Sequence, residues 1–519
     1  MIATYILITL VAVFGHSEDF LGTSLLSRPL VLGPLVGLIL GDPVQGIVIG
    51  ATLELIFMGN IKVGAAIPPD VITGGVLGTA FALLSGKGAS VALGLAVPIS
   101  ILAEMILSGL FIFRSGFNAR FAHFAEEGDF RKFERLHVFS GLLKPLLMGL
   151  LVFLALQLGA ETMKTFLDKI PAWVNQGLQV GGNLLPALGF ALLMNVMFNN
   201  KVAPYFFLGF ILSSYLQMPM IAIGGLGIVL ALILGDFKGQ GGVKNDSNEI
   251  EEKPLLSKKD IRAVFLRSFA LEANFNFETC QNTGFAFSLI PVLRKIYKKP
   301  EQMALALKRH LQFFNTSPYG STLILGIAAA MEESNAKSQD FNADSINTVK
   351  SGLMGPLAGV FDSLFWGTLK VIAAGIGVSL ALEGSFVGPV LFVLIYNVPN
   401  IFLRYKLATI GYDQGSRFLQ RLSGSALMDS LTHGASIVGL MVVGAMPPLL
   451  MSVSVPLEIG SNGTEVALQS VLDQIAPGLI PLLLTFLVYY LLKKNVKVAY
   501  LLLGLLTLGF VGSMLNVLA

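Results

Sequence analysis

Four polar side chains interrupt an apolar, glycine-broken stretch near the N-terminus: Glu54, Asn60, Lys62 and Asp70. A charged side chain at mid-membrane costs about 2.5–3.5 kcal/mol, so such residues usually face a cavity or pair with each other. Carboxylates and amides suit a sugar, because each hydroxyl both donates and accepts a hydrogen bond. We expect a polar ligand site here. The structural alternatives are a Glu54–Lys62 ion pair, two helical turns apart, and a helix cap at Asp70.

A second polar cluster lies in Asn274–Asn282 and includes Asn276. On a helix, Asn274, Glu278, Gln281 and Asn282 would share one continuous face, with the single cysteine, Cys280, in the same helix. A solvated face is one explanation. Solvated faces favour Lys, Arg and scattered Glu over a dense run of amides, so we predict a buried polar network or a ligand-facing wall.

Two further segments carry polar groups next to turn-forming residues. His310–Pro318 ends in Asn-Thr-Ser-Pro, a turn in which Asn315 can bind backbone groups, and a structural role there is at least as strong as a functional one. Gly352–Ser363 is rich in glycine and apolar residues with one acid, Asp362. It fits either a re-entrant hairpin or the kinked start of a helix.

Several chemistries are missing from the sequence. No Gly-x-x-x-x-Gly-Lys-Ser/Thr phosphate loop occurs, and the five histidines show no H-x-x-x-H spacing. One cysteine excludes an internal disulfide and a CxxC metal site. His433, the histidine deepest in apolar sequence, is assigned to packing or a helix end rather than to proton transfer. We therefore expect no catalytic residue, metal site or cofactor in this chain.

The composition indicates a membrane protein. Of 519 residues, 54% are hydrophobic and 13% charged, with a mean hydropathy of +0.74, whereas soluble domains carry about 25% charged residues. The formal charge of +3 is too small to suggest a nucleic-acid partner. The predicted fold is all-α and polytopic, in a lipid bilayer. Met1–Gly15 fits a first membrane segment better than a cleaved signal.

The elements that must position these residues fall into two halves. We predict a membrane domain over 1–236, a flexible linker over 237–256 and a second domain over 257–519. Glycine and proline between Leu30 and Phe113 indicate broken or re-entrant helices, which lipid tolerates only where protein or a wet cavity covers them. The second domain should begin with an amphipathic helical head over 257–349, opened by a capping box at Ser257–Asp260. Membrane segments follow over 350–519.

The motifs of both halves resemble one bacterial family. Arg28-Pro-Leu, Gly50-Ala-Thr-Leu-Glu54 and Gly64-Ala-Ala-Ile-Pro-Pro-Asp70 resemble subunit IIC of the mannose-family sugar phosphotransferase system. From about Leu256 the chain resembles subunit IID, through motifs that include Asn276-Phe-Glu278, His310–Thr316 and Gly352–Gly359. Two positions depart from the family pattern: Lys62 replaces a usual asparagine, and Phe361 a usual glycine.

The resemblance implies a function. In this family IIC and IID together form a trimeric sugar channel in the bacterial cytoplasmic membrane, without a phosphorylation site of their own. Separate cytosolic IIA and IIB proteins relay phosphate to the entering sugar. By motif position, Glu54 and Asp70 are the leading sugar-site candidates, for a hexose or an N-acetylhexosamine. The Pro68-Pro69-Asp70 neighbourhood leans toward amino sugars such as N-acetylgalactosamine.

The expected mechanism is alternating access, in which one rigid unit moves against the other. Two other functions remain open at this point. An ion-coupled secondary transporter would use Glu54, Asp362 or His433 as its coupling group. A non-transporting membrane receptor would bind sugar or a toxic peptide without accumulating anything.

Overall fold

The computed structural model describes most of the chain. The described residues are 2–59, 68–86, 89–159, 186–198, 202–218, 220–234, 254–338, 341–421, 425–451, 453–459, 466–494, 496 and 498–518, with scattered positions between 160 and 185. Their regular secondary structure is helical apart from one short antiparallel pair, β1 (Glu458–Ile459) and β2 (Val466–Ala467). The predicted all-α fold is confirmed. Most of the predicted linker lies outside the described residues.

Membrane-spanning helices are present in both halves. Among the described residues, five are long and apolar enough to cross a bilayer, and a sixth results if the bent pair Leu468–Ile475 and Leu479–Lys493 is one span. On helix α7, Leu142, Leu146, Leu150 and Leu154 recur every fourth residue and are 43–60% exposed. An exposed apolar stripe at helical spacing has no explanation in water, but it fits lipid contact. The chain is a multi-pass membrane protein.

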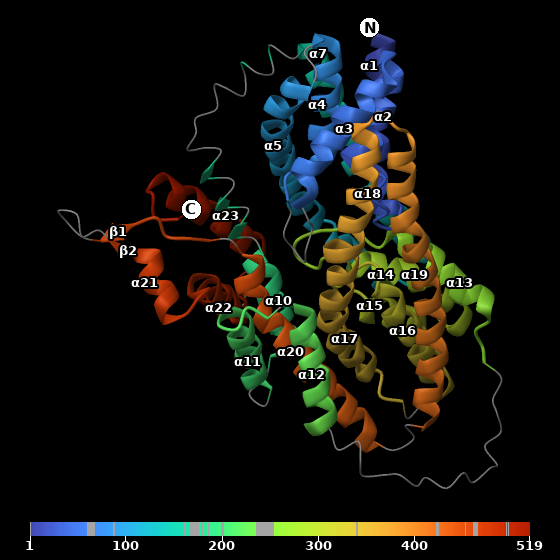
Figure 1. Ribbon diagram of the computed structural model, residues 1–519. Helices are drawn as coiled ribbons and strands as arrows, with labels where there is room; N and C mark the ends of the chain where they lie inside the picture. Colours follow the sequence, from blue (N-terminus) through green and yellow to red (C-terminus); the bar gives the residue numbers. More distant parts are fainter. Residues whose placement is uncertain are drawn as a thin grey trace.

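A first helical body occupies the upper part of Figure 1 and combines both halves of the sequence. From the first half it takes α1 (Ile2–His16), η1 (Ser17–Phe20), α2 (Pro29–Leu40), α3 (Pro43–Ile56), η2 (Phe57–Gly59), α4 (Val71–Ser85), α5 (Ala89–Ser115) and α7 (Phe130–Leu158). From the second half it takes α18 (Lys370–Leu382) and α19 (Val387–Arg421), which pack on α3 and α2.

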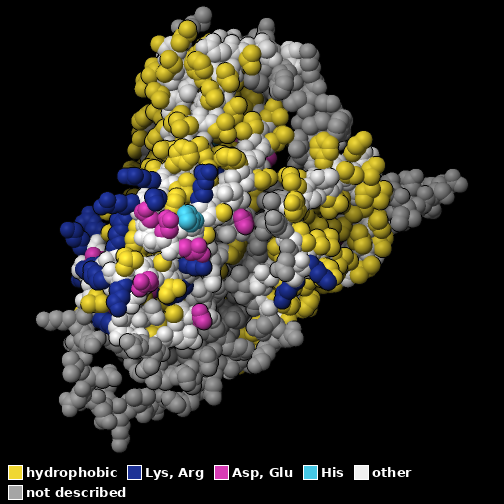
Figure 2. Space-filling view, turned by 180° about the vertical axis from the view of Figure 1, so that it is seen from behind, with side chains coloured by type: hydrophobic (Ala, Val, Ile, Leu, Met, Phe, Trp, Pro, Cys, Tyr) yellow, Lys and Arg dark blue, Asp and Glu magenta, His cyan; other side chains and the backbone are white. Residues whose placement is uncertain are grey.

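The amphipathic head lies below this body and carries most of the charged side chains on the face that Figure 2 shows. It contains α13 (Lys258–Arg267), η3 (Ser268–Ala270), α14 (Asn282–Ile296), α15 (Pro300–Arg309) and α16 (Ser321–Lys337), with α6 (Asn118–Glu126) packed on α15. The predicted capping box is present at Ser257, and Pro300 stands in the first turn of α15. The first half therefore also contributes to the head, through α6 and the start of α7.

A second helical body lies beside the head and again mixes the two halves. It contains α10 (Pro186–Met197), α11 (Ala203–Ser214), α12 (Met220–Leu234), α20 (Ser425–Leu450), α21 (Leu468–Ile475), α22 (Leu479–Lys493) and α23 (Val498–Met514). Its closest packing joins α11 and α12 to α20. Helix α17 (Asp344–Asp362) contacts α20 and α12 and continues through a π-helical segment, η4 (Ser363–Leu369), into α18 of the first body.

Short helices replace full spans in the glycine-rich region, as the sequence predicted. Helices α2 and α3 have 12 and 14 residues, about 18–21 Å at 1.5 Å per residue, less than a 30 Å bilayer core. They pack as a tight hairpin. A Cβ added to Gly46 would lie 2.6 Å from Cα of Gly37, so the two backbones touch where larger residues would separate them.

The segment Gly352–Ser363 is helical. It lies at the end of α17 and leads directly into the wide turn of η4. Pro356 is accommodated inside the helix. The segment is therefore helical rather than a re-entrant hairpin, but it forms the end of a helix and not the kinked helix start that the sequence also allowed.

Candidate functional site

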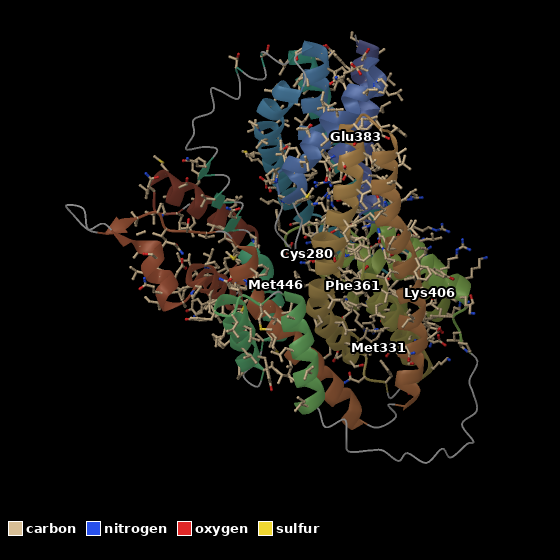
Figure 3. The ribbon with its side chains drawn as sticks, viewed as in Figure 1. Cys280, Met331, Phe361, Glu383, Lys406 and Met446 are labelled. Carbon is tan, nitrogen blue, oxygen red and sulfur yellow. The ribbon has the colours of Figure 1, made fainter. Side chains whose placement is uncertain are left out.

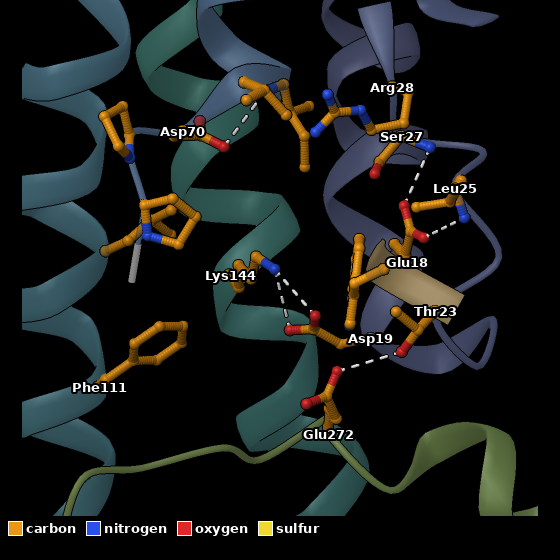
Figure 4. Close-up of a pocket in the computed structure, with 16 residues that line it drawn as sticks. Glu18, Asp19, Thr23, Leu25, Ser27, Arg28, Asp70, Phe111, Lys144 and Glu272 are labelled. Carbon is orange, nitrogen blue, oxygen red and sulfur yellow. Dashed lines mark hydrogen bonds and ion pairs between the residues drawn. The ribbon is translucent and has the colours of Figure 1, made fainter. Parts of the chain in front are cut away.

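A cavity of about 140 Å³ lies inside the first body, near its junction with the head. Figure 4 shows its wall, built from η1, the following loop, the starts of α2 and α4, α5, α7 and two second-half segments. The lining residues are Glu18, Asp19, Thr23, Leu25, Ser27, Arg28, Pro68, Pro69, Asp70, Val71, Ile72, Leu107, Phe111, Lys144, Glu272 and Trp366. A cavity of this size has room for about five water molecules at about 30 Å³ each.

Glu54 lies behind the cavity wall rather than in it. Its carboxylate is fully buried and pairs with Arg28, with 2.8 Å between Nη2 and Oε1. Nε of Arg28 donates to both carboxylate oxygens, and its Nη2 donates to the backbone oxygen of Phe57 at 2.7 Å. Glu54 therefore forms an ion pair with Arg28, whereas Lys62, the partner suggested by the sequence, lies outside the described residues. Arg28 itself lines the cavity.

Asp70 has two roles in the structure. It lines the cavity, and it caps α4 by accepting hydrogen bonds from the backbone of Ile72 and Thr73 at 3.4 and 3.1 Å. Nε2 of His16 lies 3.5 Å from its carboxylate, and both side chains are almost completely buried. The helix cap that the sequence offered as an alternative is thus present, and the same residue also lines the cavity.

Two neighbouring acids on η1 shape the lower wall. Asp19 forms an ion pair with Lys144 of α7, 2.9 Å from Nζ to Oδ1. Glu18 accepts hydrogen bonds from the backbone of Leu25 and Ser27 at 2.5 and 2.9 Å. Glu18 thus folds the loop between η1 and α2 back against its own carboxylate (Figure 4).

The second half closes the cavity with Glu272 and Trp366. Oε2 of Glu272 accepts from the Thr23 hydroxyl at 3.2 Å, and its Oε1 from Nε2 of Gln281 at 3.3 Å. The cavity therefore offers four carboxylates, two cations and the aromatic rings of Phe111 and Trp366. A largely apolar pocket with a few convergent polar groups is the usual form of a small-molecule site.

The predicted helix over Asn274–Asn282 is wrong. These residues form turns, Cys280 has φ +55°, and α14 begins only at Asn282. Oδ1 of Asn276 accepts from the backbone of Glu278 and Thr279 at 3.1 and 3.0 Å, and such local bonds compete with a helix. Figure 3 places Cys280 at the junction of the two helical bodies and the head.

A buried polar network occupies this segment instead. Asn274 accepts from Ser140 and donates to Thr283, and Gln281 donates to the backbone oxygen of Thr316 at 2.9 Å. Glu278 accepts from Asn118 of α6 at 2.8 Å. Of the predicted polar residues in the second half, only Gln281 bonds directly to a cavity residue, Glu272.

Two further candidates, Asn315 and Asp362, are not among the residues that line the cavity. Helix α15 ends at Arg309, before the turn with Asn315, whose backbone N–H points to the sulfur of Met354 at 3.2 Å. Asp362 ends α17. Asn60, Lys62 and the side chain of His433 lie outside the described residues. Among the described residues, no cluster of three His, Cys, Asp or Glu side chains is arranged to hold a metal.

Several lining residues were missed from the sequence. Glu18 and Asp19 directly follow the first apolar segment, and Lys144 interrupts the apolar part of α7 beside Pro145. Each is a charge deep in apolar sequence, which was the available signal. Nothing in the sequence connected Glu272 to Thr23, because 249 residues separate them.

Comparison with known proteins decides the family. A family model described as "PTS system mannose/fructose/sorbose family IID component" matches residues 255–518, and one described as "PTS system sorbose-specific iic component" matches residues 2–233. The chain belongs to this family. It carries the IIC and IID components of a sugar phosphotransferase transporter in one polypeptide, which confirms the resemblance seen in the motifs.

Individual relatives match one half each. The mannose-specific EIID component of Escherichia coli (strain K12) is 39% identical over 274 residues, 51% of this chain and 96% of that protein. The sorbose-specific EIIC component of Klebsiella pneumoniae is 31% identical over 211 residues, 40% of this chain and 78% of that protein. A solved chain from a complex of the mannose transporter ManYZ with microcin E492 is 39% identical, covering 51% of this chain and 98% of its own length, with a TM-score of 0.49.

These relatives are membrane permease components, not phosphorylating subunits. The IIC–IID chain is thus the membrane permease part of a phosphotransferase transporter, a system with sugar substrates and cytosolic IIA and IIB partners. Its two components interleave: the IID helices α18 and α19 pack in the first body beside IIC helices.

Proposed function

We infer that the IIC–IID chain imports a hexose or an N-acetylhexosamine through the cavity of the first body, and that a cytosolic IIB protein phosphorylates the sugar at the inner face. The observation that carries this proposal is the lining itself. Asp70, Arg28 and Glu272 come from separate segments of both components and converge on one cavity within an apolar helical body.

The chemistry of the lining suits a sugar. Carboxylates accept hydrogen bonds from hydroxyls, and Arg28 and Lys144 donate to ring or hydroxyl oxygens. Asp70 offers carboxylate oxygens at the start of α4, where the positive end of the helix dipole stabilises its charge. Glu54 acts indirectly, by holding the guanidinium of Arg28 in place, while Asn60 and Lys62 follow η2 and stay candidates from sequence alone.

Alternating access then requires the cavity to change its exposure. The first body, which holds the cavity, and the second body are joined through α17, whose π-helical continuation η4 carries the lining residue Trp366. A movement of one body against the other would be transmitted to the cavity along this helix. In this proposal the chain works as a homotrimer in the bacterial cytoplasmic membrane, and it carries no phosphorylation site.

A transport assay tests the proposal and its rivals. Cells without their own hexose transporters receive this chain with matching IIA and IIB proteins, and sugar-phosphate formation is measured for mannose, sorbose, fructose and N-acetylgalactosamine. The proposal expects accumulation of at least one sugar phosphate, lost when the phosphoenolpyruvate relay is deleted. Uptake that survives that deletion but collapses with an uncoupler would establish an ion-coupled transporter. Binding without accumulation would establish a receptor.

A further inference from the structure

A buried arginine of the IID component joins the IIC loop that lines the cavity. Arg404 on α19 is completely buried. Its Nη1 donates to the backbone oxygen of Gly22 at 2.9 Å, and its Nη2 donates to the backbone oxygen and hydroxyl of Ser268 at 2.7 and 3.0 Å. Its guanidinium lies over the ring of Phe269, 4.6 Å from the centroid.

This environment is unusual for a cation. Among the residues that the structure describes, no carboxylate lies within 4.0 Å of Arg404, so neutral oxygens and one aromatic face hold its charge. A charge placed inside a membrane body at such cost usually has a function. The planar guanidinium of arginine can donate at the same time to backbone oxygens of two separate segments, at Gly22 and Ser268, which the single ammonium of lysine does not.

The loop that Arg404 holds has a backbone that needs support. Gly22, Thr23 and Leu25 all have positive φ, at +70°, +57° and +59°. A Cβ on Gly22 would lie 2.5 Å from Nη1 of Arg404, so the close approach requires glycine. Left-handed backbone at Thr23 and Leu25 is strained and persists only where its surroundings impose it.

Other residues of the IID component hold the same loop. The N–H of Gly22 donates to the backbone oxygen of Phe269 at 3.1 Å, and Nδ2 of Asn397 donates to the backbone oxygen of Ser24 at 2.7 Å. The Thr23 hydroxyl donates to Glu272. The loop that begins with these residues then lines the cavity through Thr23, Leu25, Ser27 and Arg28.

We propose that Arg404 is a positioning residue of the sugar site: from the IID component it fixes the IIC loop 21–28, and so sets the shape of the cavity that Arg28 and Thr23 line. The effect on sugar rests on the proposed function, but the positioning of the loop does not. Arg404 lies behind the loop and is absent from the cavity lining.

The first readout reports the loop itself. Ser27→Cys places a thiol on the cavity wall at a position that is 8% exposed, and the one native cysteine, Cys280, is fully buried. The probe is a hydrophilic maleimide applied to the purified chain. Arg404→Met should raise the labelling rate about tenfold, because a hydrogen bond to a charged group contributes about 1.5–3 kcal/mol. Arg404→Lys should restore part of the protection.

Three further variants keep the test decisive. Asn397→Leu removes the hydrogen bond from half-buried Asn397 to the backbone oxygen of Ser24. If the Arg404→Met protein does not accumulate, this variant tests instead whether the IID component holds the loop. Lys406→Ala changes an exposed cation on the same helix (Figure 3) and should leave labelling unchanged. Ser288→Cys reports a buried position in the head. Equal acceleration there would mean general loosening and would overturn the proposal.

The second readout is transport, with radiolabelled mannose and N-acetylgalactosamine as probes. Arg404→Met should raise KM more than it lowers the maximal rate per assembled complex, with partial rescue by Arg404→Lys. Unchanged labelling and unchanged KM in Arg404→Met and Asn397→Leu would overturn the proposal. If neither sugar is transported by the unaltered chain, the proposed function fails while the labelling result still decides the role of Arg404.

Discussion

Arg28 and Glu54 form a buried ion pair, 2.8 Å from Nη2 to Oε1, that joins the start of α2 to the end of α3. Arg28 turns toward the cavity and Glu54 lies behind it. The pair locks together the two short helices of the hairpin, and it presents a cation of defined position to the cavity.

Glu54→Gln should reduce uptake sharply, because it releases Arg28. Removing one partner of a buried ion pair costs about 3–5 kcal/mol, so thermal stability in detergent should fall as well. The double variant Arg28→Gln/Glu54→Gln should recover most of the stability but little of the uptake. Full recovery of uptake in the double variant would show that neither side chain is needed for sugar.

Asp70→Asn separates the cap from the charge. Asparagine caps helices about as well as aspartate, so the free energy of unfolding should change by less than about 1 kcal/mol. Uptake should nevertheless drop about tenfold or more, since a carboxylate that faces the cavity is lost. Asp70→Ala should lose both functions. Wild-type KM in Asp70→Asn would remove this residue from the sugar site.

Gly46→Ala should disrupt the hairpin of α2 and α3. The new Cβ would lie 2.6 Å from Cα of Gly37 and 2.7 Å from the backbone oxygen of Gly33, and neither backbone has room to yield. We expect low amounts of folded protein and no uptake. Gly109→Ala on α5 is the matched control, because nothing lies within 4 Å of its added Cβ. It should be neutral or stabilising by up to about 1 kcal/mol.

Acid should weaken the head through His310. Its Nε2 lies 2.9 Å from Oε1 of Glu332, and burial lowers the pKa of His310 from 6.5 to about 4. Burial alone would raise the pKa of Glu332, but the hydrogen bond from His310 and the charge of Arg309 lower it. The imidazole of His310 is therefore neutral at pH 7 in the folded chain.

Proton binding by the unfolded chain determines how the free energy of unfolding changes with pH. Between pH 6.5 and 4 the unfolded chain binds a proton at this histidine and the folded chain does not. The free energy of unfolding therefore decreases as the pH is lowered through this range. The loss should reach about 3 kcal/mol at the acid end of that window. Thermal unfolding of the purified chain from pH 8 to pH 5 measures it. His310→Gln should show a shallower dependence, and an unchanged slope would contradict this assignment.

Much of the fold was readable from the sequence because it depends on local patterns. The predominantly helical fold and the capping box at Ser257 are present as predicted. The prediction of a helix over Asn274–Asn282 was wrong for an equally local reason. Asn276 satisfies backbone N–H groups through its own side chain, and this competes with helical hydrogen bonds.

The sequence predicted only some of the residues that line the cavity. Asp70 was found because a lone carboxylate in apolar sequence is costly, and it does line the cavity. Glu54 pairs with Arg28, which the hairpin brings alongside it and which the sequence spacing did not suggest; Lys62, the partner that the spacing did suggest, lies outside the described residues. Glu272 and Arg404 act across the junction of the two components, and single-sequence spacing carries no information about contacts of that range.

The most direct test is a density map of the purified chain with its transported sugar bound. The account predicts the sugar in the cavity of the first body, within hydrogen-bond distance of Asp70 and Arg28, with the ring against Phe111 or Trp366. A sugar bound in the second body, or against the outer surface of the head with this cavity unchanged, would contradict it.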